Sequence, residues 1–265
     1  IVRELEYASN GTVGFYTGYE TLDVSPSDVL TSATFDYKQM AGNVTISGLE
    51  QIQNSGTEAV INLLESRIGV LEKSMSNTLS ESLYSDGTGT SGKEVGGLQL
   101  IVADAGSGTV GGINSSTYTF WQNAQTTATS SAFSTTNIQA DMNTIYLSLV
   151  RGSDSPDLIM ADTNSYKSFL GSLQAIQRVT SDRVATSGFT SVQYLNSDVI
   201  FDDACPANKM YFLNTDYLRL EVAANRNFVP GEAKMSVNQD AMVTPMFWSG
   251  NLTCSNRALQ GVIHT

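Results

Sequence analysis

The sequence predicts an α+β fold, and three features of the chain lead to this prediction. One long helical pattern covers residues 55–85. Strand-like runs lie on either side of it, over residues 12–50 and 235–263. Between about residues 95 and 230, shorter helical patterns alternate with short apolar runs. Helical and strand periodicities in separate blocks indicate helices packed on sheets.

The helical pattern over residues 55–85 has one apolar stripe. Ser55 and Glu58 form a capping box before it, and Ser85-Asp86-Gly87 supplies a stop signal. We expect this helix to be the buried spine of the fold. Its apolar residues recur at steps of four and three, which places them on one helix face: Val60, Leu64, Ile68, Leu71, Met75, Leu79 and Leu83.

The run before this helix is rich in β-branched and aromatic residues, and Pro26 lies in a break within it. This composition favours strands. We therefore expect a long two-stranded hairpin over residues 12–52, preceded by an extended arm over residues 1–11. A hairpin of this length is marginally stable alone and needs a surface to lie on.

The middle of the chain begins with a Gly-, Ser- and Thr-rich linker over residues 86–97. A buried strand is expected over residues 98–104, and amphipathic helices over 138–149 and 164–177. Further strands are expected over 157–161, 191–201 and 209–222. This alternation predicts a mixed α/β region over about residues 95–232.

The last part of the chain contains two long strand-like runs, over residues 235–248 and 252–263. Ser249-Gly250-Asn251 lies between them and is a turn signal typical of hairpins. We expect residues 233–265 to form a hairpin that covers the exposed side of the long helix.

The charge balance disfavours a nucleic-acid-binding surface as the main function, because 26 acidic residues outnumber 14 basic ones and the net charge is −12. Charged residues make up 15% of the chain, below the roughly 25% of soluble domains. A low charge suits a protein covered by neighbours, and equally a secreted β-rich protein. No apolar run is long enough to span a membrane.

The cysteines and the start of the chain carry weaker signals. Cys205 and Cys254 have no metal-like or redox-like spacing, so we expect free thiols in a reducing compartment. The chain starts at Ile1 without a signal-peptide pattern, which suggests that an N-terminal piece was removed or omitted.

The candidate catalytic and binding motifs are weak. Residues 106–111 match G-x-G-x-x-G, but no acidic residue follows about twenty positions later, so we interpret them as a turn. His264, the only histidine, lies next to the C-terminus and is expected to be solvated. Asp202-Asp203 and the pair Asp154 and Asp157 lie beside turn residues and suit capping. We therefore expect no catalytic, cofactor-binding or metal-binding residues, and no enzyme.

Several segments, in their order along the chain, resemble a known family. They are FDYKQMAGNVTISGLEQIQNSG running into the long helix, GGINSSTYTFWQN, SPDLIMADTNSYKSFL, SDVIFDDACPANKMYFLNTDYLRLE and SGNLTCSNRALQGVI. In this order they resemble the major capsid proteins of tailed bacteriophages with the Hong-Kong-97-type fold, which encapsulin shells share. The resemblance covers nearly the whole chain from about residue 12.

The resemblance implies a domain layout. Residues 1–11 would be an N-arm, 12–52 an extended E-loop hairpin, and 53–94 a P-domain with the spine helix. Residues 95–232 would form the A-domain, and 233–265 the C-terminal strands of the P-domain.

The resemblance also implies a function. Subunits of this family assemble into hexamers and pentamers that close into an icosahedral shell around double-stranded DNA, with E-loops and N-arms lying across neighbouring subunits. The implied partners are other copies of the chain and scaffolding, portal and decoration proteins. DNA would be enclosed rather than specifically bound, and no membrane is involved. The implied location is the virion capsid, assembled in the host cytoplasm.

Two other functions fit parts of the sequence. An encapsulin-type nanocompartment shell would share the fold and enclose a cargo enzyme instead of DNA. An extracellular β-rich adhesin would explain the Ser and Thr content, but it fits poorly with a long capped helix and a mixed α/β middle region.

Overall fold

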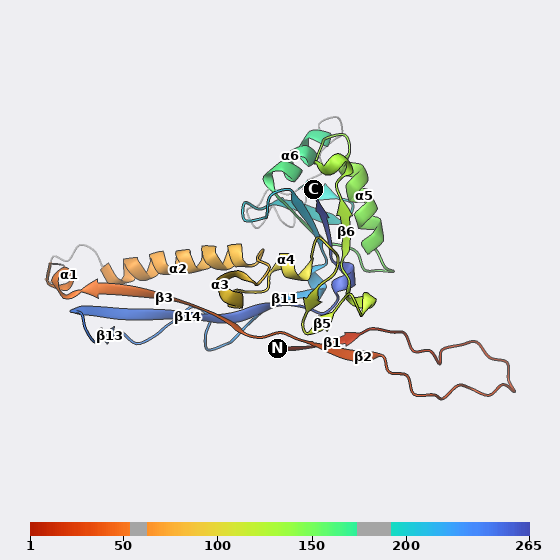
Figure 1. The fold of residues 1–265 in the computed structure, drawn as a ribbon, viewed down its shortest axis with the longest axis horizontal. Coiled ribbons are helices and arrows are strands. Elements are labelled where there is room, and N and C mark those ends of the chain that lie inside the picture. Colours follow the sequence, from red (N-terminus) through yellow and green to blue (C-terminus); the bar gives the residue numbers. More distant parts are fainter. Residues whose placement is uncertain (54–62, 174–191) are drawn as a thin grey trace.

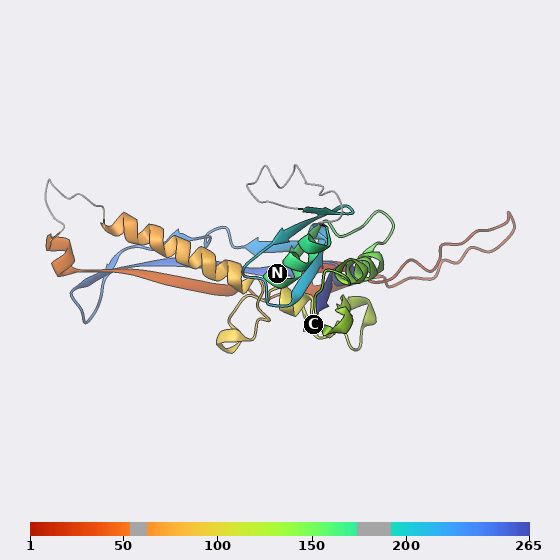
Figure 2. The same cartoon turned by 90° about the horizontal axis from the view of Figure 1, so that it is seen from above.

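The computed structural model describes residues 1–53, 63–173 and 192–265. The molecule is elongated (Figure 1): a long helix lies along two long strands at one end, a sheet with helices rises from the middle, and a thin loop extends at the other end. Figure 2 shows the same three parts in a line from above. This outline leaves much of the chain on the surface.

The first part is a sheet built around one strand, β14 (Ala241–Cys254). Ten of its residues pair with β3 (Lys38–Ser47), and its last five pair with β11 (Leu218–Val222). Two short strands, β12 (Val229–Pro230) and β13 (Lys234–Met235), also pair with it. All these pairings are antiparallel, and we call these five strands the long sheet.

The long helix is confirmed as α2 (Leu63–Ser82), which contacts β3 along one face of the long sheet (Figure 1). Its predicted stripe does face the sheet: a Cβ at Gly42 of β3 would lie only 2.4 Å from Leu71 Cδ1. However, Met75 is buried, whereas Ile68, Leu71 and Leu79 are half-buried. The prediction of a buried spine was therefore wrong, since the helix has a sheet on one side only.

The predicted end signals of α2 can be compared with the structure only at its C-terminal end. The predicted cap at Ser55 and Glu58, and Val60 of the stripe, lie outside the described residues. At the other end α2 ends at Ser82, before the predicted stop at Ser85-Asp86-Gly87. Gly87, with a φ of 75°, belongs to the loop that follows.

The second part is a six-stranded sheet with the order β6-β15-β10-β7-β9-β8. Helices α5 (Ile138–Leu149) and α6 (Thr163–Ser172) pack on one face, where alternate strand residues such as Met210 and Phe212 join their core. The other face, with Tyr211 and Leu213, packs toward the long sheet. Its strands are β6 (Ala124–Thr127), β7 (Leu158–Ala161), β8 (Val192–Tyr194), β9 (Ser197–Phe201), β10 (Lys209–Leu213) and β15 (Gly261–His264).

Several predictions for this region are confirmed. Helix α5 and strand β7 lie where the periodicity placed them, and α6 covers the described part of the predicted helix over 164–177. The predicted strand over 191–201 is two strands, β8 and β9, which pair with each other. The predicted strand over 209–222 is also two strands, because β10 and β11 belong to different sheets.

The remaining elements are short. Helices α1 (Gly48–Gln53) and α3 (Gly89–Gly92) flank α2 in the sequence, and α4 (Leu98–Ile101) follows α3. Strands β4 (Thr109–Val110) and β5 (Ile113–Asn114) pair with each other. Single turns of 3-10 helix cover Thr119–Trp121, Thr129–Ser131, Thr215–Tyr217 and Arg257–Leu259.

The predicted hairpin over residues 12–52 was wrong in its pairing. The hairpin strands are β1 (Val2–Glu6) and β2 (Leu30–Thr34), so its first strand lies in the segment expected to be an extended arm over 1–11. Strand β3 pairs instead with β14. The physical reason is burial: Val44 and Ile46 of β3 are buried in this arrangement, which a free hairpin could not provide.

The predicted strand over residues 98–104 was also wrong, since residues 98–101 form the short helix α4. Leu98 and Ile101, three positions apart, are both buried, as a helical turn requires. The Leu98 amide donates to the Leu83 carbonyl oxygen at 2.7 Å, which ties α4 to the end of α2. A short apolar run does not by itself distinguish a strand from a buried helical turn.

The predicted C-terminal hairpin over 233–265 was wrong, because β14 continues through Ser249-Gly250-Asn251 without a turn. Gly250 is required by close packing: a Cβ there would lie 2.5 Å from the Glu221 carbonyl oxygen and 2.8 Å from the Trp248 ring. The last strand, β15, belongs to the six-stranded sheet, between β6 and β10. It does not cover α2.

Arg257 connects the segments that meet between the two sheets. Its side chain is fully buried, and it donates to the carbonyl oxygens of Ile101 and Trp121, to Ser115 Oγ and to Asn123 Oδ1 at 2.5 to 3.1 Å. Burial lowers the pKa of the guanidinium to about 10. The sequence analysis did not single out Arg257.

Replacing Gly250 tests the continuous strand. Gly250→Ala should lower the free energy of unfolding by about 1–3 kcal/mol, because the new methyl group meets backbone and an indole ring. As a control, Gly69→Ala in α2 meets no atom within 4 Å and should raise the stability by about 0.5–1 kcal/mol. Chemical denaturation measures both. Equal effects of the two variants would contradict the packing role of Gly250.

Replacing Arg257 tests its bridging role. Arg257→Met should lower the free energy of unfolding by roughly 2–4 kcal/mol, because it leaves several buried acceptors without donors. Arg219→Met, at an exposed position, is the control and should change stability by less than about 0.5 kcal/mol. A neutral Arg257→Met variant in denaturant titrations would refute the bridging role.

Candidate assembly surfaces

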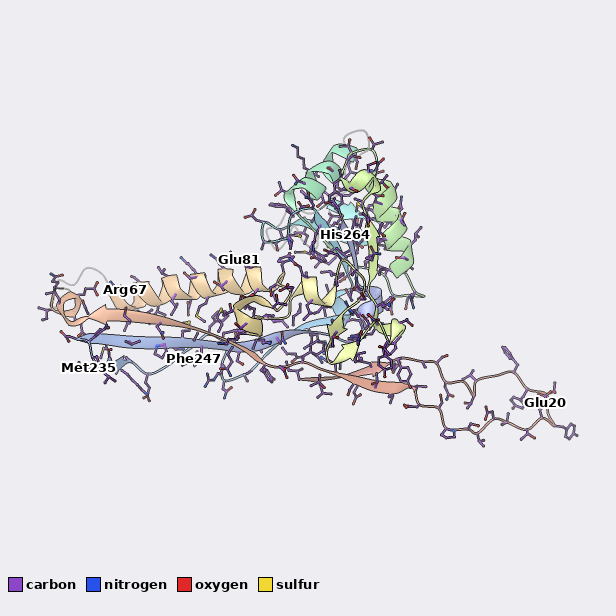
Figure 3. The ribbon with its side chains drawn as sticks, in the orientation of Figure 1. Glu20, Arg67, Glu81, Met235, Phe247 and His264 are labelled. Atoms are coloured by element: carbon purple, nitrogen blue, oxygen red, sulfur yellow. The ribbon has the colours of Figure 1, made fainter. Side chains whose placement is uncertain are left out.

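The loop between β1 and β2 extends away from the rest of the molecule. We call residues 7–29 the arm; Glu20 lies near its tip in Figure 3. Its side chains contact little else: Phe15 and Tyr19 are fully exposed, at 108% and 107%, and Val24 is 90% exposed. Large apolar side chains displayed in this way are typical of a surface that binds another protein.

Polar contacts within the arm are local. The Thr17 amide and hydroxyl donate to the Glu20 carboxylate, and the Ser25 amide donates to Asp23. These hydrogen bonds lower the pKa of both carboxyl groups. With Asp28, the arm carries three acidic residues and no Lys or Arg. It is therefore an acidic, aromatic segment.

The face of the long sheet opposite α2 is a second exposed surface. Met246 and Trp248 of β14 belong to the core beneath α2, so alternate residues such as Phe247 point to the other face. We call this face the open face; Phe247 is labelled on it in Figure 3. The Arg226 guanidinium lies 5.0 Å from the centre of the Phe247 ring. From the register, the open face comprises Ala41, Asn43, Thr45, Val229, Lys234, Val243, Pro245 and Phe247.

The open face differs in charge from the arm. Arg226 and Lys234 are exposed, and the β3 residues on this face are small or polar. A cationic group over an aromatic ring and a flat strip of small side chains suit contact with acidic, aromatic chain. The two surfaces are complementary, but they lie in different parts of one subunit (Figure 3).

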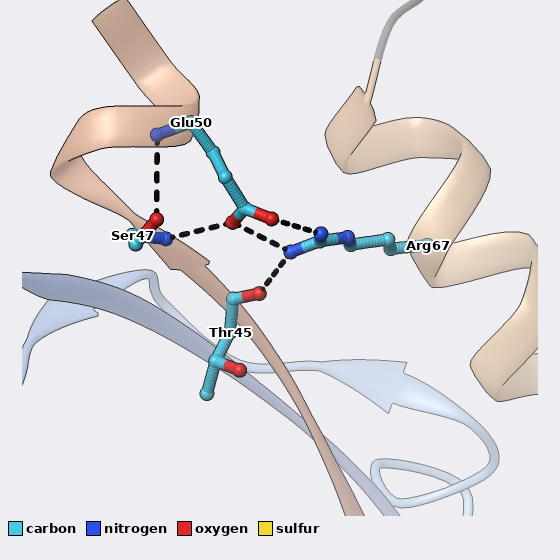
Figure 4. Close-up of polar contacts among 4 residues, drawn as sticks. All are labelled: Thr45, Ser47, Glu50 and Arg67. Carbon is cyan, nitrogen blue, oxygen red and sulfur yellow. Dashed lines mark hydrogen bonds and ion pairs between the residues drawn. The ribbon is translucent and has the colours of Figure 1, made fainter.

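A cluster of polar contacts joins α2 to the end of β3 (Figure 4). Arg67 Nη2 donates to Glu50 Oε1 at 2.6 Å, and Arg67 Nη1 donates to Glu50 Oε2 at 3.1 Å and to the Thr45 carbonyl oxygen at 2.5 Å. Ser47 and Glu50 form a capping box at the start of α1, with reciprocal bonds of 3.1 and 3.3 Å. The cluster holds one end of α2 on the long sheet.

The electrostatics of this cluster follow from its contacts. Hydrogen bonds from Arg67 and from the Ser47 amide lower the pKa of Glu50 to about 2. The hydrogen bond to the Glu50 carboxylate in turn raises the pKa of Arg67. The sequence analysis assigned a capping box to Ser55 and Glu58 and missed this one. The Ser47-Gly48-Leu49-Glu50 motif could have revealed it.

The acidic pairs identified in the sequence make mostly long-range contacts, and only the hydrogen bond from the Ala204 amide to Asp202 is the local turn contact that was expected. Asp157 accepts hydrogen bonds from the Thr215 amide and hydroxyl, and Asp154 accepts one from the Tyr217 hydroxyl. Asp202 accepts from the Ala204 amide and from the Tyr84 hydroxyl, whereas Asp203 is exposed.

Other sequence candidates are also placed. His264 is half-buried in strand β15, with Nε2 3.3 Å from Gln125 Oε1, so the expectation of a frayed, solvated end was wrong. The glycine motif over 106–111 follows α4 instead of a strand, and Gly106, Gly108 and Gly111 have positive φ, as turns require.

Both cysteines are free, as predicted, and both are buried. Burial raises the pKa of each thiol to about 12. Within residues 1–53, 63–173 and 192–265, no three His, Cys, Asp or Glu side chains gather in a way that could hold a metal ion. No helix in the same ranges has the length and apolar character needed to cross a membrane.

The Glu50–Arg67 contact predicts a pH dependence. Because the pKa of Glu50 is lower in the folded state, its stabilising effect is present above about pH 4.5 and disappears as the pH falls toward 2. Glu50→Gln should therefore be less stable than the parent at pH 7, and the difference should vanish near pH 2. Thermal unfolding at a series of pH values measures this difference.

Arg67→Met provides the control for this experiment. In that background, Glu50→Gln should show a much smaller pH-dependent difference, since the largest cause of the pKa shift is gone. A difference between parent and Glu50→Gln that stays constant from pH 7 to pH 2 would contradict the assignment.

Comparison with known proteins shows which structures share the fold of this chain. No family model and no curated protein sequence matches the chain. Among solved structures, a chain of the cyanophage A-1(L) capsid asymmetric unit matches with a TM-score of 0.77 at 17% identity, over 100% of this chain and 87% of that chain. The capsid of Myoviridae phage XM1 matches with a TM-score of 0.62 at 10% identity, over 100% and 85%.

An encapsulin has the same architecture. The SrpI encapsulin of Synechococcus elongatus matches with a TM-score of 0.64 at 9% identity, over 90% of this chain and 76% of that chain. At identities this low, the structural matches show a shared fold and nothing further. The chain therefore has the α+β, Hong-Kong-97-type fold of phage capsid proteins.

Proposed function

We propose that this chain is the major capsid protein of a tailed bacteriophage. It would self-assemble into hexamers and pentamers of an icosahedral shell that encloses double-stranded DNA. The observation that carries this proposal is the full-length match to a chain of the cyanophage A-1(L) capsid asymmetric unit, which extends over the arm as well as both sheets. The proposed role is structural, and we propose no enzymatic activity.

The pairing of the strands supports domain ranges that differ from those expected from the sequence. We propose that β1, the arm and β2 form the E-loop, so that it spans residues 2–34 rather than 12–52. The long sheet and α2 would form the P-domain. The six-stranded sheet with α5 and α6 would form the A-domain, which then includes the last strand, β15.

In the proposed shell, the arm lies across a neighbouring copy. Its exposed aromatic side chains support this role, because they have little contact within their own chain. The arm and the open face carry opposite charges. This favours contact of the arm of one copy with the open face of another copy over contact between two arms.

Other partners follow from the same proposal. Scaffolding, portal and decoration proteins would bind the shell during or after assembly in the host cytoplasm, and the chain would end in the virion capsid. The net charge of −12 supports enclosure of DNA without tight binding, because phosphate contacts require Lys and Arg. No membrane contact is part of the proposal.

An encapsulin-type shell is the second candidate, supported by the match to the SrpI encapsulin. The match to the encapsulin covers 90% of this chain, whereas the matches to the two phage capsids cover all of it. Particles isolated from the native source distinguish the two: nuclease-resistant double-stranded DNA supports a capsid, and a stoichiometric cargo enzyme supports an encapsulin. An extracellular adhesin is disfavoured by the full-length fold match.

Particle formation tests the function, and a change in the arm tests the mechanism. The full chain should form closed particles or capsomers in negative-stain micrographs. Replacing Phe15 and Tyr19 with Ser should prevent assembly and leave the circular dichroism unchanged, because both side chains are fully exposed in the subunit. The control combines Phe15→Tyr with Tyr19→Phe, which keeps both rings and should assemble.

Two outcomes would count against this account. A full chain that remains monomeric at all salt and protein concentrations would refute the shell function. Normal assembly of the Ser variant would leave the shell function standing and refute the role of the arm.

A further inference from the structure

Buried polar side chains gather where the end of α2 meets the six-stranded sheet. Tyr84, just after α2, is 5% exposed, and its hydroxyl donates to Asp202 Oδ2 at 2.7 Å. Its ring centre lies 6.2 Å from that of Tyr211 on β10. The end of α2 is thus held against the sheet by a ring contact and by one direct hydrogen bond.

Tyr211 differs from Tyr84 in its hydroxyl group. The residue is fully buried, yet its hydroxyl has no hydrogen-bond partner among the residues that the structure describes. Burial raises the pKa of Tyr211, and Cys205 and Asp104 raise it further, so the hydroxyl keeps its proton. A buried donor of this kind is costly unless another group accepts its hydrogen bond.

Asp104, which follows α4, presents the complementary group. Its Oδ2 accepts from Lys209 Nζ at 2.6 Å, whereas its Oδ1 is buried and has no partner in the described part of the chain. Lys209 and Tyr211 are two positions apart on β10, so their side chains lie on the same face of the sheet. Lys209 thus holds Asp104 on the side of the sheet that carries Tyr211, and Asp104 is near enough to contribute to the raised pKa of Tyr211.

We infer that one ordered water molecule links Tyr211 to Asp104 at this junction. The Tyr211 hydroxyl donates to the water oxygen, and the water donates to Asp104 Oδ1. Water suits the site because it is both acceptor and donor, and buried waters typically satisfy polar groups of this kind. A metal ion suits it less, since Lys209 already neutralises the carboxylate and the phenol is protonated.

The bridge would add a contact that the sequence could not reveal. It would tie the segment after α4 to the centre of the six-stranded sheet, next to the direct Tyr84–Asp202 bond that ties α2 to the same sheet. This inference concerns the folded subunit and does not depend on the proposed function.

Removing the Tyr211 hydroxyl gives opposite results for a bridged and an unbridged group. If water links it to Asp104, Tyr211→Phe should lower the Tm of the full chain by about 2–4 °C. If the hydroxyl is unpartnered, Tyr211→Phe removes a buried polar group and should leave the Tm unchanged or raise it, which would overturn the inference. Tyr84→Phe, which breaks a direct bond, is the matched control and should lower the Tm.

An experimental structure of the full chain at high resolution completes the test. Density for one water within about 3.2 Å of both Tyr211 Oη and Asp104 Oδ1, absent in Tyr211→Phe, would support the bridge. A direct Tyr211–Asp104 hydrogen bond, or no water between the two atoms, would overturn it even if the Tm fell.

Discussion

The rest of the structure depends on the continuous pairing of β14 with β3 and β11. This one strand of fourteen residues supports α2 on one face, leaves the other face open, and leads through the buried Arg257 into the six-stranded sheet. A turn at Ser249-Gly250-Asn251 would end this connection. The long sheet and the six-stranded sheet are therefore joined by the chain that runs from β14 to β15 and by the buried hydrogen bonds of Arg257.

Because β3 is committed to β14, the N-terminal segment must form its own small sheet. Strands β1 and β2 supply it, and the arm between them extends beyond any surface of its own chain. An arm with fully exposed aromatic side chains is not stabilised within the subunit. In the proposed shell, burial of the arm against another copy supplies that stabilisation.

Local patterns predicted local structure well and long-range pairing poorly. Helix α5 and strand β7 followed from periodicity, since their buried residues repeat within one element. The partner of β3 lies some two hundred positions away in the sequence, so alternation could not identify it. Gly250 suggested a turn because close packing and turns both favour glycine. Arg257 and the Tyr211–Asp104 junction involve contacts between distant segments, which local patterns cannot reveal. The family resemblance indicated the order of the segments along the chain, but it did not indicate which strands pair.

Hydrogen exchange of the arm tests the central claim most directly. Amides of residues 7–29 should exchange rapidly in the isolated subunit, where most of them have no backbone partner, and should become protected in assembled particles. The amides of β14 should be protected in both states. Protection of the arm in the isolated subunit, or rapid exchange of the arm within particles, would contradict the account.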